Sequence, residues 1–180
     1  MQVVKNAHKI LLMIEIGLER LKNDANIQAK ITGNIALLCH SASVDKEFKV
    51  APIILKDIYG DRFVKLFGPQ HGFVSDVQDN MVETDHYTHP YFGIPVYSLY
   101  SDTRKPTPKM LEGIDTFVVD LQDVGTRVYT YITTVTYILE ECAKAGIKVV
   151  ILDRPNPVGL DKIEGNILET KFKSFVGAME

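Results

Sequence analysis

Acidic, amide and guanidinium side chains gather in one short stretch of the chain, residues 117–131. An apolar run at 117–119 stops at Asp120, and Asp123 and Arg127 follow before a predicted helix. Carboxyl groups can act as general acids or bases, and a guanidinium can hold a carboxylate through two hydrogen bonds. Ligands of open α/β sheets bind beyond the carboxyl ends of the strands. The pattern therefore predicts a polar site at this strand end.

Two other apolar runs end in polar loops of the same kind. The run at 64–67 leads into GPQHG at 68–72, where flanking glycines would let Gln70 and His71 approach a ligand closely. The run at 149–152 leads into DRPNP, a loop that two prolines make rigid. Both loops are also compatible with plain turns whose polar side chains point into solvent. The second loop supplies Asp153, Arg154 and Asn156.

The acidic and basic residues of the 117–131 stretch allow two interpretations that do not exclude each other. Asp120, Asp123 and Arg127 could form an ion-pair network that locks the loop, or Arg127 could hold a ligand carboxylate. Tyr131 opens the next predicted helix, where it could stack on a ligand or hydrogen-bond to it. His40 lies in the polar loop after the first predicted strand.

The elements that must position these residues alternate between strands and helices, which predicts an α/β domain with a mostly parallel sheet. Residues 74–93 are predicted to be a long irregular loop, and 160–180 a tail without a closing element. The predicted helices cover 7–22, 51–59, 108–112 and 129–144, and the predicted strands cover 35–39, 64–67, 96–99, 116–121 and 148–152.

Composition excludes several classes of protein. The 180 residues are 46% apolar and 24% charged. The net charge of −3 argues against binding to nucleic acid or to an anionic membrane, since both attract basic proteins. The apolar run at 10–14 is followed by Glu15 and Glu19, so it predicts a helix rather than a signal peptide, and with it a cytoplasmic location. Cys39 and Cys142 are predicted to be buried thiols.

Motifs for nucleotides, cofactors and metals are missing. The chain has no GxGxxG, no Walker loop and no GxSxG, which argues against nucleotide-dependent and α/β-hydrolase chemistry. His86 and His89 form an HxxH pair, but the segment is predicted to be a loop, so no metal site is expected. We therefore expect no cofactor.

Long motifs in a fixed order resemble those of one known family. From residue 35 onward the sequence resembles the bacterial exo-β-N-acetylmuramidases, glycoside hydrolases long catalogued as a domain of unknown function. The motifs that carry the resemblance are LFGPQHGF at 66–73, PVYSLY at 95–100, RKPTPKMLEGID at 104–115, VVDLQDVGTRVYTYI at 118–132, VILDRPNPVG at 150–159, IEGNIL at 163–168 and SFVG at 174–177.

The resemblance implies a fold and an activity. Residues 1–180 would be a single Rossmann-like three-layer domain, the amino-terminal part of a two-domain architecture whose second domain is missing. The implied activity is release of terminal N-acetylmuramic acid from the non-reducing ends of peptidoglycan fragments. The expected partner is a muropeptide or amino-sugar substrate, with no nucleic acid and no membrane. The protein could form a homo-oligomer, or a separate chain could supply the missing domain. Members of the family are often exported.

Site roles follow from the same resemblance. Glycoside hydrolysis usually needs two carboxyl groups, and the catalytic candidates are Asp120, Asp123 and Glu164, although pattern alone would place Glu164 on the surface. Gln70 is the fourth candidate, because the family usually has glutamate there, in GPEHG. Glutamine keeps the hydrogen bonds but cannot transfer a proton, so a catalytically impaired binding domain is the alternative function. The substrate-binding candidates are His40, His71, Arg127, Tyr131, Asp153, Arg154 and Asn156.

Overall fold

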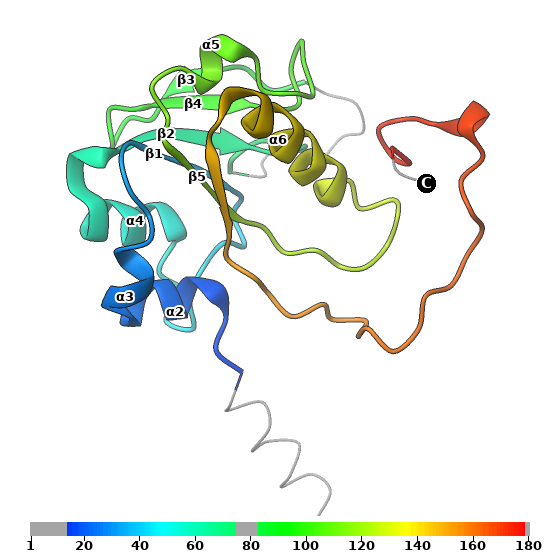
Figure 1. Cartoon of the computed structure of the whole chain (residues 1–180), viewed down its shortest axis with the longest axis horizontal. Helices are drawn as coiled ribbons and strands as arrows, with labels where there is room; N and C mark the ends of the chain where they lie inside the picture. The colour runs from blue at the N-terminus through cyan, green and yellow to red at the C-terminus, as the bar shows by residue number, and fades with distance from the viewer. Residues whose placement is uncertain (1–13, 75–82, 179–180) are drawn as a thin grey trace, which may run out of the picture.

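A computed structural model describes residues 14–74 and 83–178 of the chain, and these form three layers. Figure 1 shows a central six-stranded sheet with helices on both of its faces. The predicted α/β fold with a mostly parallel sheet is therefore confirmed. Among the described residues, every helix is too short or too polar to cross a lipid bilayer.

The sheet has the strand order β3-β4-β2-β1-β5-β6, and all neighbours are parallel except β3 and β4. Five strands lie close to their predicted positions. The sixth, β3, falls inside the segment predicted to be an irregular loop, because two exposed residues are too short to show a strand period. The strands are β1 Ile35–Cys39, β2 Phe63–Gly68, β3 Tyr87–Thr88, β4 Pro95–Ser98, β5 Thr116–Asp120 and β6 Lys148–Ile151.

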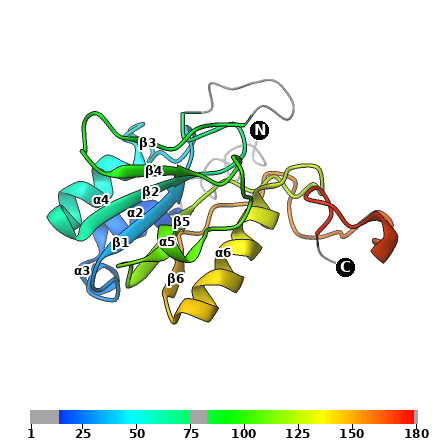
Figure 2. The ribbon, with the colours of Figure 1, turned by 90° about the horizontal axis from the view of Figure 1, so that it is seen from above.

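Helices α2, α3 and α4 cover one face of the sheet, and α5 and α6 cover the other, as Figure 2 shows from above. Thr107 caps α5: its hydroxyl oxygen accepts a hydrogen bond from the Met110 N–H. The helices are α2 Gly17–Asn23, α3 Ala25–Gln28, α4 Ala51–Tyr59, α5 Pro108–Leu111 and α6 Tyr131–Ala145, with 3₁₀ turns η1 Gly60–Arg62 and η2 Thr170–Phe172.

The first helix begins later than the sequence pattern predicts. Residues 7–13 of the expected helix lie outside the described residues, and 14–16 are not helical. Helix α2 starts at Gly17, whose N–H donates a hydrogen bond to the Asp153 carbonyl oxygen at 2.7 Å. This contact fixes the start of α2 against the carboxyl end of β6.

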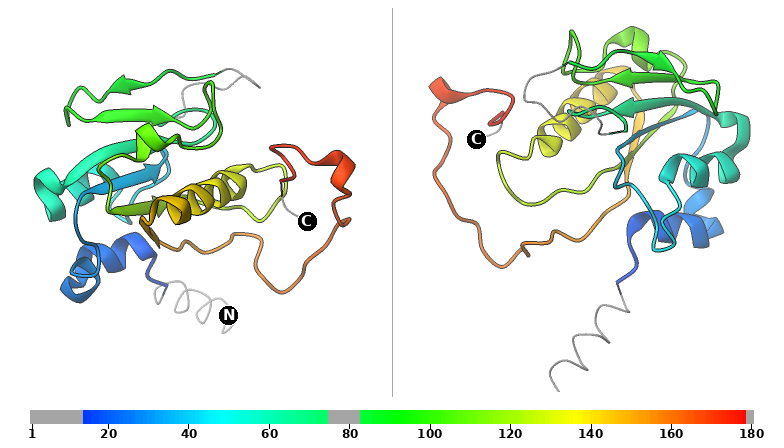
Figure 3. Two further views of the ribbon diagram at one scale, coloured as in Figure 1. Left: turned by 45° about the horizontal axis from the view of Figure 1, so that its top comes forward. Right: turned by 180° about the vertical axis from the view of Figure 1, so that it is seen from behind.

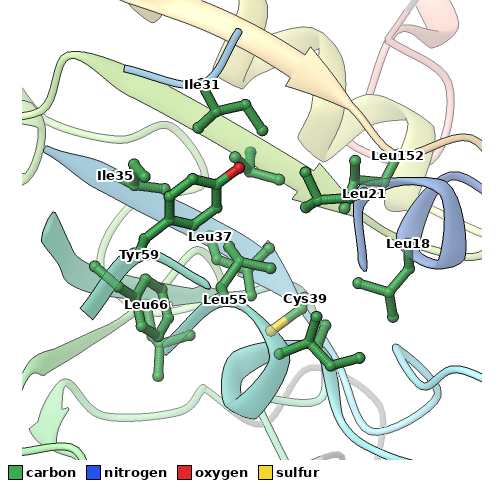
Figure 4. Packing of buried hydrophobic residues seen from close by; sticks show 14 of the residues in the cluster. Leu18, Leu21, Ile31, Ile35, Leu37, Cys39, Leu55, Tyr59, Leu66 and Leu152 are labelled. Atoms are coloured by element: carbon green, nitrogen blue, oxygen red, sulfur yellow. The ribbon is translucent and has the colours of Figure 1, made fainter. Parts of the chain in front are cut away.

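Strand β1 lies at the centre of the core, and all five of its residues are buried. Its side chains alternate between the two faces. Leu37 and Cys39 pack with α2 and α4, whereas Leu38 packs with α5 and α6. Figure 4 shows Leu37 among Leu55 and other residues of the first cluster. Burial on both faces is expected for a central parallel strand, and it makes β1 the support of the site beyond its end.

Beyond β6 the chain leaves the layered body in a long arc, visible in Figures 1 and 3. One 3₁₀ turn, η2, is its only helical or strand element within the described residues, in line with the predicted tail. The arc returns at Phe175, whose ring lies 5.8 Å from that of Tyr100 and 6.2 Å from that of Tyr137. Several of its apolar side chains are exposed, namely Val158, Leu160, Ile163, Ile167 and Phe172.

Truncation of Leu37 tests the central position of β1. Leu37→Ala should lower the free energy of unfolding by about 2–5 kcal/mol, because it leaves a cavity between fixed layers. Leu139→Ala is the matched control, since Leu139 on α6 is 42% exposed, and surface changes usually stay within about 0.5 kcal/mol. Denaturant unfolding followed by circular dichroism gives both values. Equal losses in the two variants would contradict this description of the core.

Candidate active site

The parallel order of β2, β1, β5 and β6 brings their carboxyl ends to one edge of the sheet. The loops that follow these strands carry most of the residues singled out from the sequence. Each strand end contributes one residue to the centre of this edge: Gln70 after β2, His40 after β1, Asp120 at the end of β5, and Arg154 after β6.

Asp120 and Arg154 form a buried ion pair. The Arg154 Nε lies 2.6 Å from Asp120 Oδ1, and Arg154 Nη2 lies 2.9 Å from Asp120 Oδ2. The two side chains are 0% and 8% exposed. Arg154 Nη2 also donates a hydrogen bond to the Val44 carbonyl oxygen at 3.1 Å. The pair therefore joins the ends of β5 and β6 to the loop after β1.

The ion pair clarifies the network predicted from the sequence. Asp120 has its salt bridge with Arg154, and no ion pair of Arg127 is found within residues 14–74 and 83–178. Burial raises the pKa of the Asp120 carboxyl, and the hydrogen bonds and charge of Arg154 oppose that rise. Both carboxylate oxygens of Asp120 contact the Arg154 guanidinium, so this geometry allows Asp120 to fix the position of Arg154. A direct catalytic role for Asp120 stays a prediction.

Ser43 connects His40 to the same pair. Its hydroxyl accepts a hydrogen bond from the His40 backbone N–H at 3.1 Å and donates one to the Asp120 carbonyl oxygen. The His40 side chain lies edge-on to Tyr131, with ring centroids 5.0 Å apart. Burial, together with the nearby Arg154 charge, lowers the pKa of His40 to about 4. The imidazole is therefore neutral at pH 7.

Gln70 is held at the start of α6. Its side-chain oxygen accepts a hydrogen bond from the Thr130 hydroxyl at 2.7 Å. The turn that presents Gln70 is tight: a Cβ at Gly68 would lie 2.7 Å from the Phe73 nitrogen, and His71 has a φ of 72°. Glycine at 68 is thus required by backbone contact. Nothing in the sequence marked Thr130, because only the fold places it opposite Gln70.

Tyr131 completes a connected path across the four strand ends. Its ring lies 4.5 Å from that of Tyr129, and burial raises the pKa of Tyr131, so the phenol stays protonated at pH 7. The path runs from Gln70 through Thr130 and Tyr131 to His40, and from there through Ser43 to the ion pair. It ties the loops after β1, β2, β5 and β6 into one unit.

A cavity of about 320 Å³ opens beside this path, between β5, β6 and α6. Val119 and Leu152 form part of its apolar wall. The Gln122 side-chain amide donates a hydrogen bond to the Pro155 carbonyl oxygen at 2.9 Å, which joins the two loops at its mouth. Five of the residues predicted from the sequence line this cavity together: Asp123, Tyr131, Asp153, Arg154 and Asn156.

The other predicted residues lie elsewhere. Gln70 and His71 follow β2 and do not line this cavity, and His40 lines a second one. Arg127 is exposed, and its Nη2 donates a hydrogen bond to the Asn166 carbonyl oxygen at 2.7 Å. Glu164 is exposed on the tail. The catalytic and binding roles of all these residues stay predictions.

The histidines of the HxxH pair have local structural partners. His86 Nδ1 accepts a hydrogen bond from the Ser98 N–H at 3.0 Å, and His89 Nδ1 accepts one from the Tyr91 N–H at 3.2 Å. The part of the chain that the structure describes contains no group of three or more His, Cys, Asp or Glu residues placed to hold a metal ion. Cys39 and Cys142 are buried free thiols, as predicted.

Comparison with known proteins identifies the family. The family described as exo-β-N-acetylmuramidase NamZ, N-terminal, matches residues 35–180. The chain belongs to the NamZ family. This match confirms the family resemblance seen in the sequence motifs, and it includes every loop of the site described above.

Similar proteins of the NamZ family are longer than this chain. The peptidoglycan β-N-acetylmuramidase NamZ of Bacillus subtilis (strain 168) is 43% identical over 164 residues, which cover 91% of this chain and 39% of that protein. A DUF1343 family protein of Bacteroides fragilis has a crystal structure with a TM-score of 0.80 at 39% identity, covering 91% of this chain and 40% of its own. A second from the same organism has a TM-score of 0.69 at 32% identity, with 91% and 41% covered. The chain thus spans about two fifths of these relatives.

Removal of the Asp120 charge tests the ion pair. Asp120→Asn should lower the free energy of unfolding by about 3–5 kcal/mol, because it leaves the Arg154 charge buried without its partner. Glu169→Gln is the control, since the Lys171–Glu169 pair is 66% and 65% exposed and such pairs contribute about 0–1 kcal/mol. Denaturant unfolding measures both. A loss for Asp120→Asn as small as the control's would rule out this role for the pair.

The buried His40 should make stability depend on pH. Between pH 6.5 and about 4, the unfolded chain binds a proton at His40 that the folded chain does not. The free energy of unfolding should therefore fall as the pH falls through this window, by up to about 3 kcal/mol from this group. In His40→Gln that part of the loss should disappear. Unfolding curves at several pH values measure it, and parallel pH profiles for the two proteins would show that the prediction is wrong.

Proposed function

We propose that this chain is the amino-terminal part of a peptidoglycan β-N-acetylmuramidase that releases terminal N-acetylmuramic acid from non-reducing ends. The observation that carries this proposal is the NamZ family match over residues 35–180, which includes all four strand-end loops. The connected path across these loops supports it, because a glycosidase needs groups held in fixed positions around the reacting bond.

Gln70 decides between hydrolysis and binding alone. A glycosidase needs one carboxylic acid to protonate the leaving oxygen and a second carboxylate as base or nucleophile. The Gln70 side chain is anchored by the Thr130 hydroxyl, and a carboxylate at this position could accept the same hydrogen bond. The amide can do neither acid nor base chemistry. This substitution favours the second candidate function, a domain that binds muropeptides and cleaves them weakly or not at all.

The other carboxyl groups take different parts in this proposal. Asp120 is inaccessible and holds Arg154, so we assign it a positioning role. Asp123 is half-buried and lines the cavity of about 320 Å³, where it and the exposed Asp153 are both accessible carboxylates. The family architecture includes a further domain, on the same or a separate chain. In this proposal that domain covers the open side of the cavity and fixes the position of Glu164, which lies on the tail.

Two guanidinium groups could hold the lactyl carboxylate of muramic acid. Arg154 directs Nε and Nη2 to Asp120 and has an almost fully buried side chain. Arg127 is exposed, and its Nη2 donates a hydrogen bond to the carbonyl oxygen of Asn166 in the tail. We therefore assign the substrate carboxylate to Arg127, which can present its remaining donors to an anion in a bidentate pair.

A single substitution at Gln70 tests the proposal. We expect weak or absent hydrolysis of a chromogenic N-acetylmuramic acid glycoside by this chain alone. When the chain is joined to the corresponding carboxyl-terminal part of the Bacillus subtilis relative, Gln70→Glu should raise turnover well over tenfold, since general acid–base catalysis contributes about 10²–10⁴-fold.

Gln70→Ala in the same fusion is the control, because it removes the amide and its hydrogen bond from Thr130 and supplies no carboxyl group. If Gln70→Glu were no more active than Gln70→Ala, the acid–base assignment would fail and the binding function would be favoured. Rapid turnover by the unaltered chain alone would show that neither glutamine nor the short span disables it.

A further inference from the structure

Val44, in the loop after β1, contacts Arg154 through its backbone. Its carbonyl oxygen accepts a hydrogen bond from Arg154 Nη2 at 3.1 Å. The N–H on the other side of the same peptide group, that of Asp45, donates a hydrogen bond to the Lys49 carbonyl oxygen at 3.0 Å. A peptide group is planar and normally trans, so its C=O and N–H point in opposite directions, and fixing one fixes the other. The turn that binds the Asp45 N–H therefore aims the Val44 carbonyl at Arg154.

The Asp45 carboxylate closes this turn, residues 45–49, which we name the Asp45 turn. Its Oδ1 accepts hydrogen bonds from the backbone N–H groups of Glu47 at 3.0 Å and Lys49 at 2.8 Å. Its Oδ2 lies 2.7 Å from Lys22 Nζ, and the side chain is 0% exposed. The turn needs this support, because Phe48 within it has a φ of 61°, in the left-handed region that only glycine adopts without cost. A buried side-chain acceptor of this kind holds the backbone in one conformation.

Helix α2 braces the Asp45 turn from the side of the core. Two leucines of α2 are fully buried in the core, where Figure 4 shows them. On the same helix, Glu19 Oε1 accepts a hydrogen bond from the Lys46 N–H at 3.2 Å. At the other end of α2, the Gly17 N–H donates to the Asp153 carbonyl oxygen, and a Cβ at Gly17 would lie 2.5 Å from the Asp153 nitrogen. One helix thus contacts both segments that meet at Arg154, the turn after β1 and the loop after β6.

The Val44 contact adds a constraint on Arg154 that Asp120 cannot supply alone. Two hydrogen bonds to one carboxylate still let the guanidinium swing about that carboxylate as a hinge. The Val44 carbonyl oxygen holds Nη2 from a different segment of the chain and so blocks this swing. Arg154 lines the cavity of about 320 Å³, so its direction sets part of that cavity's wall. A displacement of about 1 Å at such a wall can cost about 10²-fold in rate.

We propose that Asp45 is a positioning residue of the candidate site, which fixes the Arg154 guanidinium at the cavity wall through the Asp45 turn and the Val44 carbonyl oxygen. Asp45 does not line that cavity, so it acts through Arg154. The Lys22 ammonium balances the buried carboxylate charge, and the Oδ1 contacts shape the turn. The importance of this placement for catalysis rests on the proposed glycosidase function, whereas the placement itself can be measured in the chain alone.

NMR of the Arg154 side chain in the isotope-labelled protein tests this role. The Nε and Nη2 protons of Arg154 should give separate resonances that exchange slowly with water, because both nitrogens are buried and hydrogen-bonded. Asp45→Ala should make the Nη2 protons exchange roughly tenfold faster or more, as expected for the loss of one hydrogen bond to a charged group. Asp45→Asn should restore slow exchange, since the amide oxygen still accepts hydrogen bonds from the turn.

Two control variants separate the turn from the Lys22 ion pair and from general destabilisation. Lys22→Met removes the cation but keeps the Oδ1 contacts, so Arg154 exchange should not change. Asp115→Ala removes a carboxylate that also accepts a backbone hydrogen bond, from the Asn34 N–H at 2.7 Å, but it lies before β5 at the opposite edge of the sheet. Arg154 exchange should not change in this variant either.

Three results would overturn the proposal: slow Arg154 exchange that persists in Asp45→Ala, an equal acceleration in Lys22→Met, or an equal acceleration in Asp115→Ala. Should Asp45→Ala fail to fold, Asp45→Ser takes its place, because a hydroxyl accepts the turn N–H groups more weakly than a carboxylate does. Slow exchange that persists in Asp45→Ser would then contradict the proposal in the same way.

Failure of this inference is distinguishable from failure of the proposed function. In the Gln70→Glu fusion, Asp45→Ala should lower kcat/KM roughly tenfold or more, and Asp45→Asn should recover most of the loss. An active fusion whose kcat/KM is the same with Asp45→Ala would overturn the positioning role and leave the muramidase function standing. An inactive fusion, with Arg154 exchange that follows the variants as described, would support the placement of Arg154 and count against catalysis alone.

Discussion

The buried ion pair between Asp120 and Arg154 is the interaction on which the site depends. It places two full charges out of solvent at the edge of the sheet, with both carboxylate oxygens bonded to the guanidinium. Such a pair is weak support for overall stability, since removing charges from water costs about as much as their attraction returns. Its effect is geometric: it fixes where β5, β6 and the loop after β1 end relative to one another.

Two side chains next to the ion pair, His40 and Tyr131, are uncharged, and the ion pair is part of the reason. The Arg154 charge adds to burial in keeping the His40 imidazole neutral, and burial keeps the Tyr131 phenol protonated. His40 and Tyr131 thus stand between two cavities as neutral hydrogen-bonding and stacking groups.

Gln70 occupies a well-defined position in the turn after β2, but its side chain cannot act as an acid or a base. The turn that carries it keeps the features of a ligand-binding loop, with Gly68 in close backbone contact with Phe73 and the amide anchored by Thr130. What position 70 lacks is a side chain that can exchange a proton. A domain can therefore retain the NamZ fold and the positions of its strand-end loops while differing in catalytic power, because position depends on packing and proton transfer depends on one side chain.

The sequence by itself determined the layers and the strands except β3, because hydrophobic periodicity and turn residues are local signals. It also determined the edge at which the polar loops meet, because the carboxyl ends of parallel strands lie at one edge of the sheet. It also predicted five residues that line one cavity. Only the tertiary structure decided which charges meet: Asp120 pairs with Arg154, 34 positions away, and the sequence pattern had suggested Arg127. The same holds for Thr130 beside Gln70 and for His40 Nε2, which has no hydrogen-bond partner among residues 14–74 and 83–178. Such contacts join residues far apart in the chain, and their geometry depends on packing that no local pattern encodes.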